Sequence, residues 1–265
     1  MKISSPKRFR ASAGFTMVEI AISLAIIGIA LVAIIGVLPM GLRVQSDNRE
    51  QTIINQDATV LMQAVTSGSR GMDDLTNYVY AITNYWKDYA SGNTGINGYT
   101  FATYSISPGC PIFGSALTNG ANIVGLLSTP EYTDGNGYPQ PNLINGVYSN
   151  HVVAYVRSMS GPATEKPPQN NPLMLQNAFS YIVICANLPV QSDTNNVSPY
   201  TRALQENLRE LRLTYLWPLL PNGGIGFGNQ TFRTMVSGQL NITPVNSGPS
   251  PNLYFFQSFT FTNAP

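Results

Sequence analysis

Residues that could perform acid–base or nucleophilic chemistry are scarce in this chain of 265 residues. His151 is the single histidine, and it stands beside Val152 and Val153 in an apolar run typical of a strand. A Ser–His–acid triad would have to use this one imidazole, and the sequence has no Gly-x-Ser-x-Gly turn to present a nucleophile. We therefore expect a solvated or structural histidine and no catalytic residues.

Metal chemistry is limited in the same way. Two cysteines, Cys110 and Cys185, with one histidine are too few for a four-ligand Cys/His zinc site. Residues 134–137 (DGNG) begin like a calcium loop, but Tyr138 occupies the next ligand position and no glutamate closes the loop. The Asx-rich residues 193–196 offer oxygens too, although such clusters commonly form turns. We expect turns at both places, with no metal and no cofactor.

The most unusual charged residue is Glu19, because it lies inside an apolar segment. Residues 15–42 are apolar apart from Thr16, Glu19 and Ser23, and residues 1–14 before them carry four basic residues and no acidic one. As a helix, residues 15–42 would span about 42 Å, more than the roughly 30 Å of a bilayer's hydrocarbon core. Basic leaders stay in the cytoplasm, so the chain after this segment is predicted to face the other side of the membrane.

Two simpler explanations compete for this segment, a cleaved secretory signal and a plain membrane anchor. A secretory signal is cut after its apolar core at a small-residue site, whereas this segment is long and continues into a polar helical pattern. A plain anchor leaves Glu19 unexplained, since a carboxylate inside a bilayer costs about 2.5–3.5 kcal/mol on insertion scales. Glu19 therefore needs a partner.

Residues 14–19 read GFTMVE and resemble the cleavage and methylation motif of type IV pilins and type II secretion pseudopilins. The resemblance implies that a prepilin peptidase cuts between Gly14 and Phe15 on the cytoplasmic side, that the new amino terminus of Phe15 is methylated, and that the apolar helix remains. Glu19 becomes the fifth residue of the mature chain. In a bundle of such helices its carboxylate can neutralise a neighbour's N-terminal ammonium and so set the register of the filament.

A second resemblance concerns the C-terminal part of the chain. It rests on residues 211–218 (LRLTYLWP), 221–223 (PNG) and 232–238 (FRTMVSG). These segments resemble the pilin-like proteins called Verru_Chthon cassette protein B. That family is known by a pilin-type start and adds no chemistry to the first resemblance.

Helical periodicity continues beyond the apolar segment. One helical face carries four apolar residues at spacings of four, three and four: Ile54, Ala58, Leu61 and Val65. We predict one helix from residue 15 to about residue 67, ended by the Ser/Gly-rich residues 67–71, with its second half packed against a globular domain. Pro39 lacks a backbone donor and should kink or locally melt this helix.

The next segment has a mixed pattern. Asp73 and Asp74 suit the first turn of a second amphipathic helix. Its apolar face would carry Leu75, Tyr78, Val79, Ile82, Trp86 and Tyr89. Residues 91–150 are rich in Gly, Asn, Pro and Ser, and we expect long loops there with short strands, one of them at 99–106.

Strand patterns dominate the rest of the chain. They cover residues 152–156, 181–186, 211–217, 231–236 and 253–261. Strands that follow an N-terminal helix predict an α+β domain with an antiparallel sheet. The packing of that sheet on the long helix, as in pilins, is implied by the resemblance. The four glycines within residues 223–228 suit a hairpin or an exposed loop.

The two cysteines lie in the part of the chain that we place outside the cytoplasm, where oxidation is permitted. A disulfide between Cys110 and Cys185 would contribute about 4 kcal/mol in the chain-entropy model. Alternatively, Cys185 is a small buried hydrophobe in the apolar run at residues 181–185. The sequence leaves both alternatives open.

The charge composition argues against nucleic acid as a partner. The net charge is +1, and after residue 42 acidic residues slightly outnumber basic ones, so no basic strip for nucleic acid is expected. Charged residues make up only 10% of the chain, against about a quarter in ordinary soluble domains. This composition suits a surface exposed outside the cell or buried among neighbouring subunits.

These observations predict three regions. Residues 1–14 form a cytoplasmic leader, residues 15–42 a transmembrane and filament-core helix, and residues 43–265 an extracytoplasmic pilin-like domain that includes the second half of the long helix. The resemblance implies a single-pass protein of the inner membrane, with a cytoplasmic N-terminus and a periplasmic bulk, that enters a periplasmic or cell-surface filament. Its partners would be prepilin peptidase, other pilin or pseudopilin subunits, the inner-membrane assembly platform and membrane lipid.

The predicted function is that of a non-enzymatic, bulky minor subunit of a type II secretion pseudopilus or a related type IV filament. One alternative is a type IV minor pilin for adhesion or DNA uptake. A membrane-tethered extracytoplasmic enzyme is another, and it would need a pocket with a perturbed acid or base.

Overall fold

The computed structural model describes nine segments of the chain: residues 14–68, 73–100, 112–114, 116–141, 147–160, 178–190, 199–243, 252–257 and 260–261. The chain divides into two compact units, Met1–Gln51 and Thr52–Pro265. Residues 1–13 of the predicted leader, Cys110 and the Asx-rich residues 193–196 lie outside the described segments.

The first unit contributes one element, the N-terminal part of helix α1. This helix extends over Met17–Ser67 and continues through Pro39 as uninterrupted α-helix. The kink at Pro39 stays a prediction. Residues 14–49 are all exposed, and within the described residues α1 is the one helix that is long and apolar enough to cross a membrane.

The second unit contains the C-terminal part of α1, where one face is buried as predicted. Ile54, Ala58, Leu61 and Val65 are each at most 1% exposed. The helix ends after Ser67 because Gly68 turns left-handed at φ 57° and its N–H donates to the carbonyl of Val65 at 3.2 Å. A side chain at Gly68 would also lie 2.3 Å from the carbonyl oxygen of Phe256, so glycine is required there.

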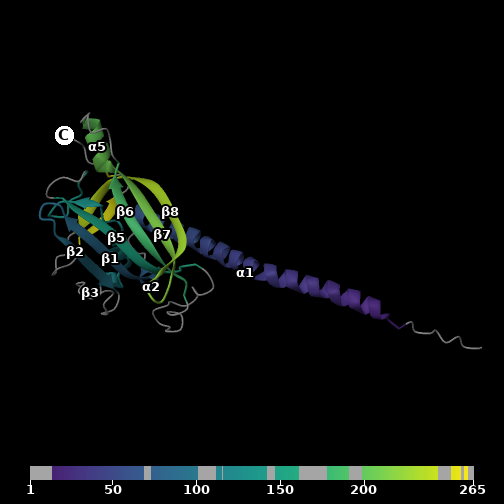
Figure 1. Ribbon diagram of the computed structural model, residues 1–265. Helices are drawn as coiled ribbons and strands as arrows, with labels where there is room; N and C mark the ends of the chain where they lie inside the picture. The colour runs from purple at the N-terminus through teal and green to yellow at the C-terminus, as the bar shows by residue number, and fades with distance from the viewer. Residues whose placement is uncertain are drawn as a thin grey trace, which may run out of the picture. The chain divides into compact units, whose positions relative to one another are not determined.

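An eight-stranded sheet forms the body of the second unit (Figure 1). Its strands are β1 (Val79–Asp88), β2 (Thr94–Thr100), β3 (Ile112–Gly114), β4 (Tyr132–Thr133), β5 (Tyr148–Arg157), β6 (Ser180–Pro189), β7 (Leu208–Leu219) and β8 (Ile225–Ser237). Their order is β3-β2-β1-β5-β6-β7-β8, with β4 paired to β5. All pairs are antiparallel except β2 with β3.

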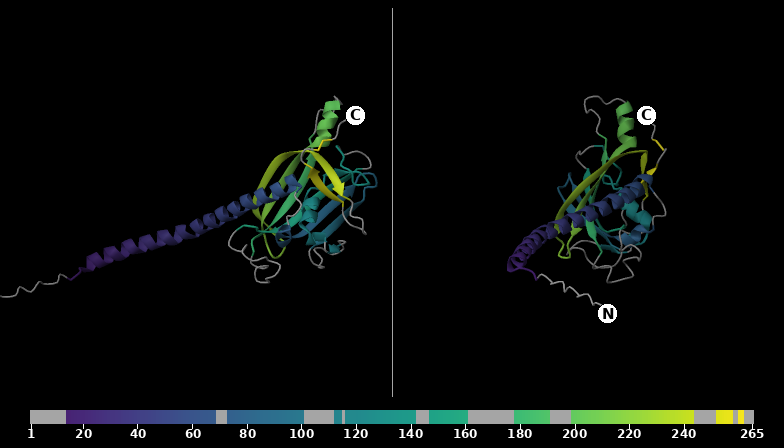
Figure 2. Two further views of the ribbon diagram at one scale, coloured as in Figure 1. Left: turned by 180° about the vertical axis from the view of Figure 1, so that it is seen from behind. Right: turned by 90° about the vertical axis from the view of Figure 1, so that its right-hand side faces the viewer.

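A second layer covers one face of this sheet (Figure 2). It contains α3 (Gly120–Leu127) and the pair β9 (Gln239–Thr243) and β10 (Leu253–Gln257), in addition to the buried part of α1. The covered face follows a cross-strand row of Ile82, Ala154, Val183 and Tyr215. Helix α3 contacts β10, β1 and β5, and the row belongs to the same core as the apolar residues of α1 and α3.

The prediction of a second amphipathic helix is wrong. Only α2 (Leu75–Tyr78) is helical, and Val79–Asp88 forms β1, the strand between β2 and β5. The apolar residues that suggested a helical face also fit a strand, because Ile82 and Trp86 lie on the same side at a period of two as well as four. The β-branched and aromatic residues of this segment favour a pleated, half-buried surface.

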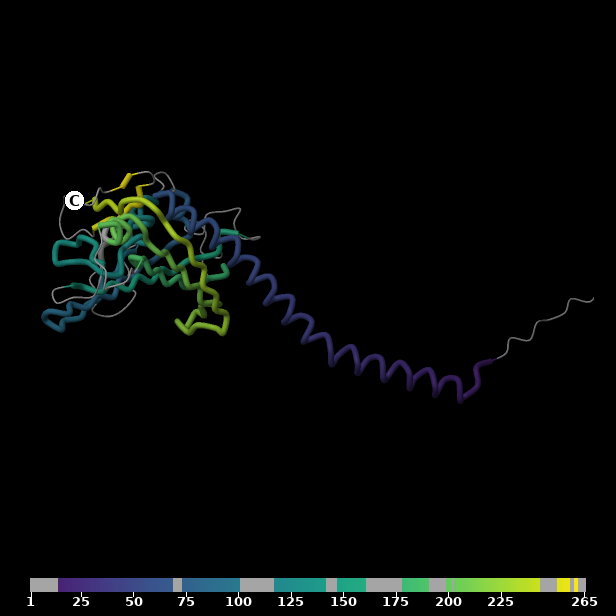
Figure 3. Tube along the Cα trace, turned by 90° about the horizontal axis from the view of Figure 1, so that it is seen from above, coloured from purple at the N-terminus to yellow at the C-terminus, as the bar shows by residue number. Residues whose placement is uncertain are grey.

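Most other strands are confirmed. β5, β6, β7 and β8 contain the predicted segments, β10 begins at the predicted residue, and Thr94–Thr100 includes the start of the strand expected at 99–106. The glycines of residues 223–228 lie in the β7–β8 hairpin, as expected (Figure 3). The sequence patterns missed α3, β9 and α5 (Pro199–Asn207), and η1 (Ala116–Thr118) also lies in a region read as loops.

A buried carboxylate ties α1 to two other parts of the second unit. Asp57 is 1% exposed, and its Oδ2 accepts hydrogen bonds from the backbone N–H of Met159 and the hydroxyl of Tyr181, both at 2.9 Å. Its Oδ1 accepts from the hydroxyl of Ser160 at 2.7 Å. Burial raises the pKa of Asp57 above its ordinary value, although these hydrogen bonds act to lower it.

We predict that Asp57→Ala lowers the free energy of unfolding by about 2–4 kcal/mol, because the Tyr181 hydroxyl and the Met159 N–H lose their acceptor. Asp57→Asn should cost much less, since the amide oxygen can accept both bonds and the amide nitrogen can donate to Ser160. Denaturant unfolding of the full chain in detergent micelles measures both values. Equal losses for Ala and Asn would contradict the assignment of these hydrogen bonds.

The raised pKa of Asp57 also makes stability depend on pH. A carboxyl group whose pKa is higher in the folded state stabilises the fold fully below its unfolded pKa, near 3.8, and loses that contribution as the pH rises through the folded pKa. The difference in unfolding free energy between wild type and Asp57→Asn should therefore shift in favour of the variant as the pH is raised from about 3.5 toward neutrality. A difference independent of pH would show that burial does not perturb this carboxyl.

Candidate functional site

The predicted cleavage point lies just before α1. Gly14, Phe15 and Thr16 precede the helix and form no regular structure, and the Phe15 side chain is 84% exposed. A peptide bond here is free of the helical hydrogen bonds that would keep it from a protease. A Cβ added at Gly14 would meet no atom within 4 Å, so the folded chain itself does not require glycine at this position.

Glu19 lies in the first turn of α1, where it completes a capping box with Thr16. Its Oε2 accepts hydrogen bonds from the backbone N–H and the hydroxyl of Thr16, both at 2.8 Å. In return, the backbone N–H of Glu19 donates to the Thr16 hydroxyl at 3.3 Å. The first helical bond follows, from the N–H of Ile20 to the carbonyl of Thr16 at 3.2 Å. These contacts satisfy N–H groups that would otherwise lack a partner at the helix start.

Thr16 is thus a residue of the helix start, in contact with Glu19, that the sequence reasoning missed. The signal was present, since Thr-x-x-Glu before an apolar run is the pattern of a capping box. Both bonds from Thr16 go to Oε2 of Glu19. Oε1 makes no hydrogen bond within the described part of the chain, so one carboxylate oxygen is left for another donor.

The surface of α1 that follows Glu19 is apolar on every side. The large apolar side chains between Phe15 and Val44 are 48–88% exposed, with Ile20 the least and Met17 the most exposed. A helix that is apolar all round is stable only in an apolar environment, which a bilayer or a bundle of similar helices supplies. This region can therefore anchor the chain or pack with other copies of such a helix.

The other residues predicted from the sequence do not gather into one site. His151 is exposed on β5 as expected, with its ring centroid 6.5 Å from that of Tyr85. Asp134 forms the expected turn, since its Oδ1 accepts from the N–H groups of Asn136 at 2.9 Å and Tyr138 at 2.7 Å. Among the described residues, no three His, Cys, Asp or Glu side chains cluster in a way that could hold a metal ion.

Cys185 lies on β6 and is 3% exposed. Burial raises the pKa of its thiol to about 12. It forms no disulfide within the described segments, and its predicted partner Cys110 lies outside them. The disulfide therefore stays a prediction.

Comparison with known families finds one match, to the model described as the prokaryotic N-terminal methylation motif, over residues 9–35. No curated protein and no solved structure matches the chain. The resemblance of residues 211–238 to Verru_Chthon cassette protein B stays a prediction. The chain carries the prepilin-type methylation motif of type IV pilins and pseudopilins, on a long apolar helix whose C-terminal part packs against an antiparallel sheet in a pilin-like α+β fold.

Proposed function

We propose that this chain is a structural, non-enzymatic and minor subunit of a type II secretion pseudopilus or a related type IV filament. The observation that carries the proposal is the capped apolar helix that starts at Met17, two residues after the Gly14–Phe15 bond, and whose apolar side chains are exposed on all sides. Such a surface has to be covered by lipid or by other subunits.

Processing would convert the membrane-stored precursor into an assembly-competent subunit. Prepilin peptidase would hydrolyse the Gly14–Phe15 peptide bond on the cytoplasmic side, leaving a carboxylate on Gly14 and an amine on Phe15. Methylation of that amine keeps it basic, so the mature N-terminus carries a positive charge. Because Gly14 meets no steric demand in its own chain, its role is assigned to recognition by the peptidase.

Glu19 would then have two roles. Through Oε2 it caps its own helix at Thr16, and through Oε1 it would accept from the ammonium of a neighbouring subunit's Phe15. An ion pair in apolar surroundings discriminates strongly between registers, because a displaced subunit leaves a buried charge without a partner. The capping bonds hold the carboxylate in place before the neighbour arrives.

The location and partners proposed for the chain follow from its apolar helix and its methylation motif. Before assembly the chain would sit in the inner membrane with its leader in the cytoplasm and the second unit in the periplasm. After cleavage it would join other pilin or pseudopilin subunits at the inner-membrane assembly platform. The apolar part of α1 would become the filament core, and the second unit would face outward.

We predict that co-expression with a prepilin peptidase shortens the chain by its first 14 residues and leaves methylated Phe15 at the N-terminus. Mass spectrometry of the intact protein and of its N-terminal peptide measures both changes. Gly14→Val should stay at full length, because recognition is lost while the fold is unaffected. A cut beyond residue 42, or an intact leader in the presence of active peptidase, would refute the processing step.

A second prediction separates the charge of Glu19 from its capping role. Glu19→Gln retains a side-chain oxygen for Thr16, since glutamine also serves in capping boxes, but it removes the negative charge. We expect normal cleavage and membrane insertion, with incorporation into sheared filaments reduced by about tenfold or more, the effect of losing at least ~1.4 kcal/mol of pairing.

Thr16→Ala is the matched control, because it removes the two hydrogen bonds of the Thr16 hydroxyl but keeps the Glu19 carboxylate and its bond from the Thr16 backbone N–H. It should lower helix stability by about 0.5–2 kcal/mol and leave filament incorporation largely intact. Filament and membrane fractions are compared in cells that make equal amounts of each variant. Equal incorporation of Glu19→Gln and wild type would show that the carboxylate does not determine assembly.

A further inference from the structure

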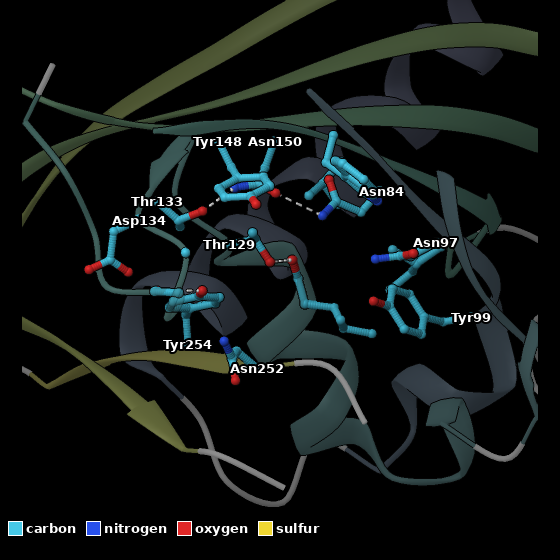
Figure 4. A pocket seen from close by; sticks show the side chains of 16 residues that line it. Asn84, Asn97, Tyr99, Thr129, Thr133, Asp134, Tyr148, Asn150, Asn252 and Tyr254 are labelled. Atoms are coloured by element: carbon cyan, nitrogen blue, oxygen red, sulfur yellow. Dashed lines mark hydrogen bonds between the residues drawn. The ribbon is translucent and has the colours of Figure 1, made fainter. Parts of the chain in front are cut away.

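A cavity of about 280 Å³ opens in the second unit, between the covered face of the sheet and the layer formed by α3, β10 and the loop at Asp134 (Figure 4). Three neighbouring strands, β1, β2 and β5, supply its sheet side. Across from them lie residues that include Leu126, Thr129, Asn252 and Tyr254. All of the described residues that line the cavity belong to the second unit.

On the sheet side of the cavity the lining residues are every second residue of each strand, because alternate side chains of a strand lie on the same face. β1 contributes Ile82, Asn84 and Trp86; β2 contributes Asn97 and Tyr99; β5 contributes Tyr148, Asn150 and Val152. Cross-strand pairing places Asn84 opposite Asn97, and Trp86 opposite Asn150. A row of amide and aromatic side chains thus lines a face that elsewhere carries the apolar core.

The indole of Trp86 lies over the backbone of its cross-strand partner Gly95. A Cβ at Gly95 would come within 2.3–2.8 Å of three atoms of the indole, so the ring can occupy this place only because residue 95 is glycine. The ring of Tyr148 adjoins it, with centroids 5.9 Å apart and planes at 57°. The half-buried indole is therefore a fixed aromatic surface at the cavity.

A chain of hydrogen bonds holds the side-chain amides of Asn150 and Asn84, and the carbonyl acceptor of Pro130 fixes which atom of each amide donates. Asn150 Nδ2 donates to the carbonyl of Pro130 at 3.2 Å and to the Thr133 hydroxyl at 3.0 Å, so its Oδ1 faces Asn84. Asn84 Nδ2 donates to that oxygen at 3.0 Å. The remaining atom, Asn84 Oδ1, is buried and has no hydrogen-bond partner among the described residues.

The cavity thus offers hydrogen-bonding capacity with little charge. Besides Asn84 Oδ1, the side-chain amide of Asn97 makes no hydrogen bond within the described segments and is half-buried. Among the described residues no lysine, arginine or histidine lines the cavity, and the one carboxylate among them, Asp134, already accepts two backbone hydrogen bonds through Oδ1. A matching ligand carries hydroxyl groups, no negative charge and one apolar face.

We propose that this cavity binds one unit of a neutral saccharide. A sugar ring presents hydroxyl groups at its edge and C–H groups on its face, and the C–H groups suit the electron-rich face of the Trp86 indole. A hydroxyl would donate to Asn84 Oδ1 and satisfy an acceptor that the described part of the fold leaves unpaired. The volume lies just below the range of about 300–1,000 Å³ usual for ligand pockets, which suits a single ring.

The test uses the full chain in micelles of an amine-oxide detergent, because glycoside detergents would compete for the cavity. The probes are the methyl glycosides of glucose, galactose, mannose and N-acetylglucosamine, with glucuronate as an anionic counterpart. Isothermal titration calorimetry measures affinity, and saturation-transfer NMR identifies the sugar protons that approach the protein. We expect saturable binding of at least one neutral probe and none of glucuronate.

Four variants locate the binding. Trp86→Ala should weaken it by at least about tenfold, and Asn97→Ala, a change at a half-buried amide without partners in the described segments, by about 3- to 10-fold. Gly95→Ala adds a methyl group that displaces the indole and should weaken binding about as much as Trp86→Ala. Tyr85→Ala is the matched control, because Tyr85 is an exposed aromatic residue of β1 on the opposite face, and it should change affinity by less than about twofold.

Near-ultraviolet circular dichroism checks that each variant keeps its tertiary structure. Absence of saturable binding for all four neutral probes would overturn the proposal, as would preferential binding of glucuronate. A loss of affinity in Tyr85→Ala equal to that in Asn97→Ala would place the ligand elsewhere and overturn it too. None of these outcomes affects cleavage at Gly14 or the role of Glu19, which are tested separately.

Discussion

The apolar surface of α1 between Phe15 and Val44 is the constraint on which the first unit of this protein depends. A helix with this surface requires lipid or other helices around it, and in such surroundings no water is available for the free N–H groups at its start. The Thr16–Glu19 capping box supplies acceptors from within the chain. A carboxylate that would be costly in an ordinary membrane anchor is thus part of the helix start, and its second oxygen can serve assembly.

In the second unit the covered face of the sheet has two environments. Toward β6 and β7 it buries Val183, Leu213 and Tyr215 against the apolar core that includes α1, and Asp57 fixes the helix to Tyr181 by a hydrogen bond that tolerates little displacement. Toward β1, β2 and β5 the same face becomes amide-rich and borders a cavity. The first environment maximises burial of apolar surface and holds the fold together. The second gives up part of that burial, as expected where a ligand site replaces core packing.

Much of the fold follows from local patterns. The buried face of α1 and the alternating strands of β5 to β8 were predictable because each depends on a periodicity within one segment. The end of α1 at Gly68 was predictable because glycine favours the left-handed conformation that ends a helix. The segment of β1 was misassigned because apolar residues four apart, such as Ile82 and Trp86, satisfy both the helical and the strand period. The cavity could not be predicted, since Asn84, Asn97 and Asn150 are brought together only by the register of three strands. The Asp57 network depends on contacts across more than a hundred residues and has no sequence signature either.

Asp57 in the core and Asn84 at the cavity differ in whether their buried oxygens accept hydrogen bonds from the described residues, and this difference bears on function. Asp57 is buried with both of its oxygens satisfied, so the cost of removing it from water is offset inside the fold. Asn84 Oδ1 is buried with no donor in the described segments, which costs about 1–3 kcal/mol that an apolar side chain of similar size would avoid. The hydroxyl of Tyr215 also has no partner among the described residues, but Tyr215 is fully buried in the core and does not line the cavity, so no ligand could reach it. At Asn84 the missing donor can come from a molecule that enters the cavity. The cost is then recovered on binding, and the rigid Asn150 and Trp86 around it need no rearrangement to receive that molecule.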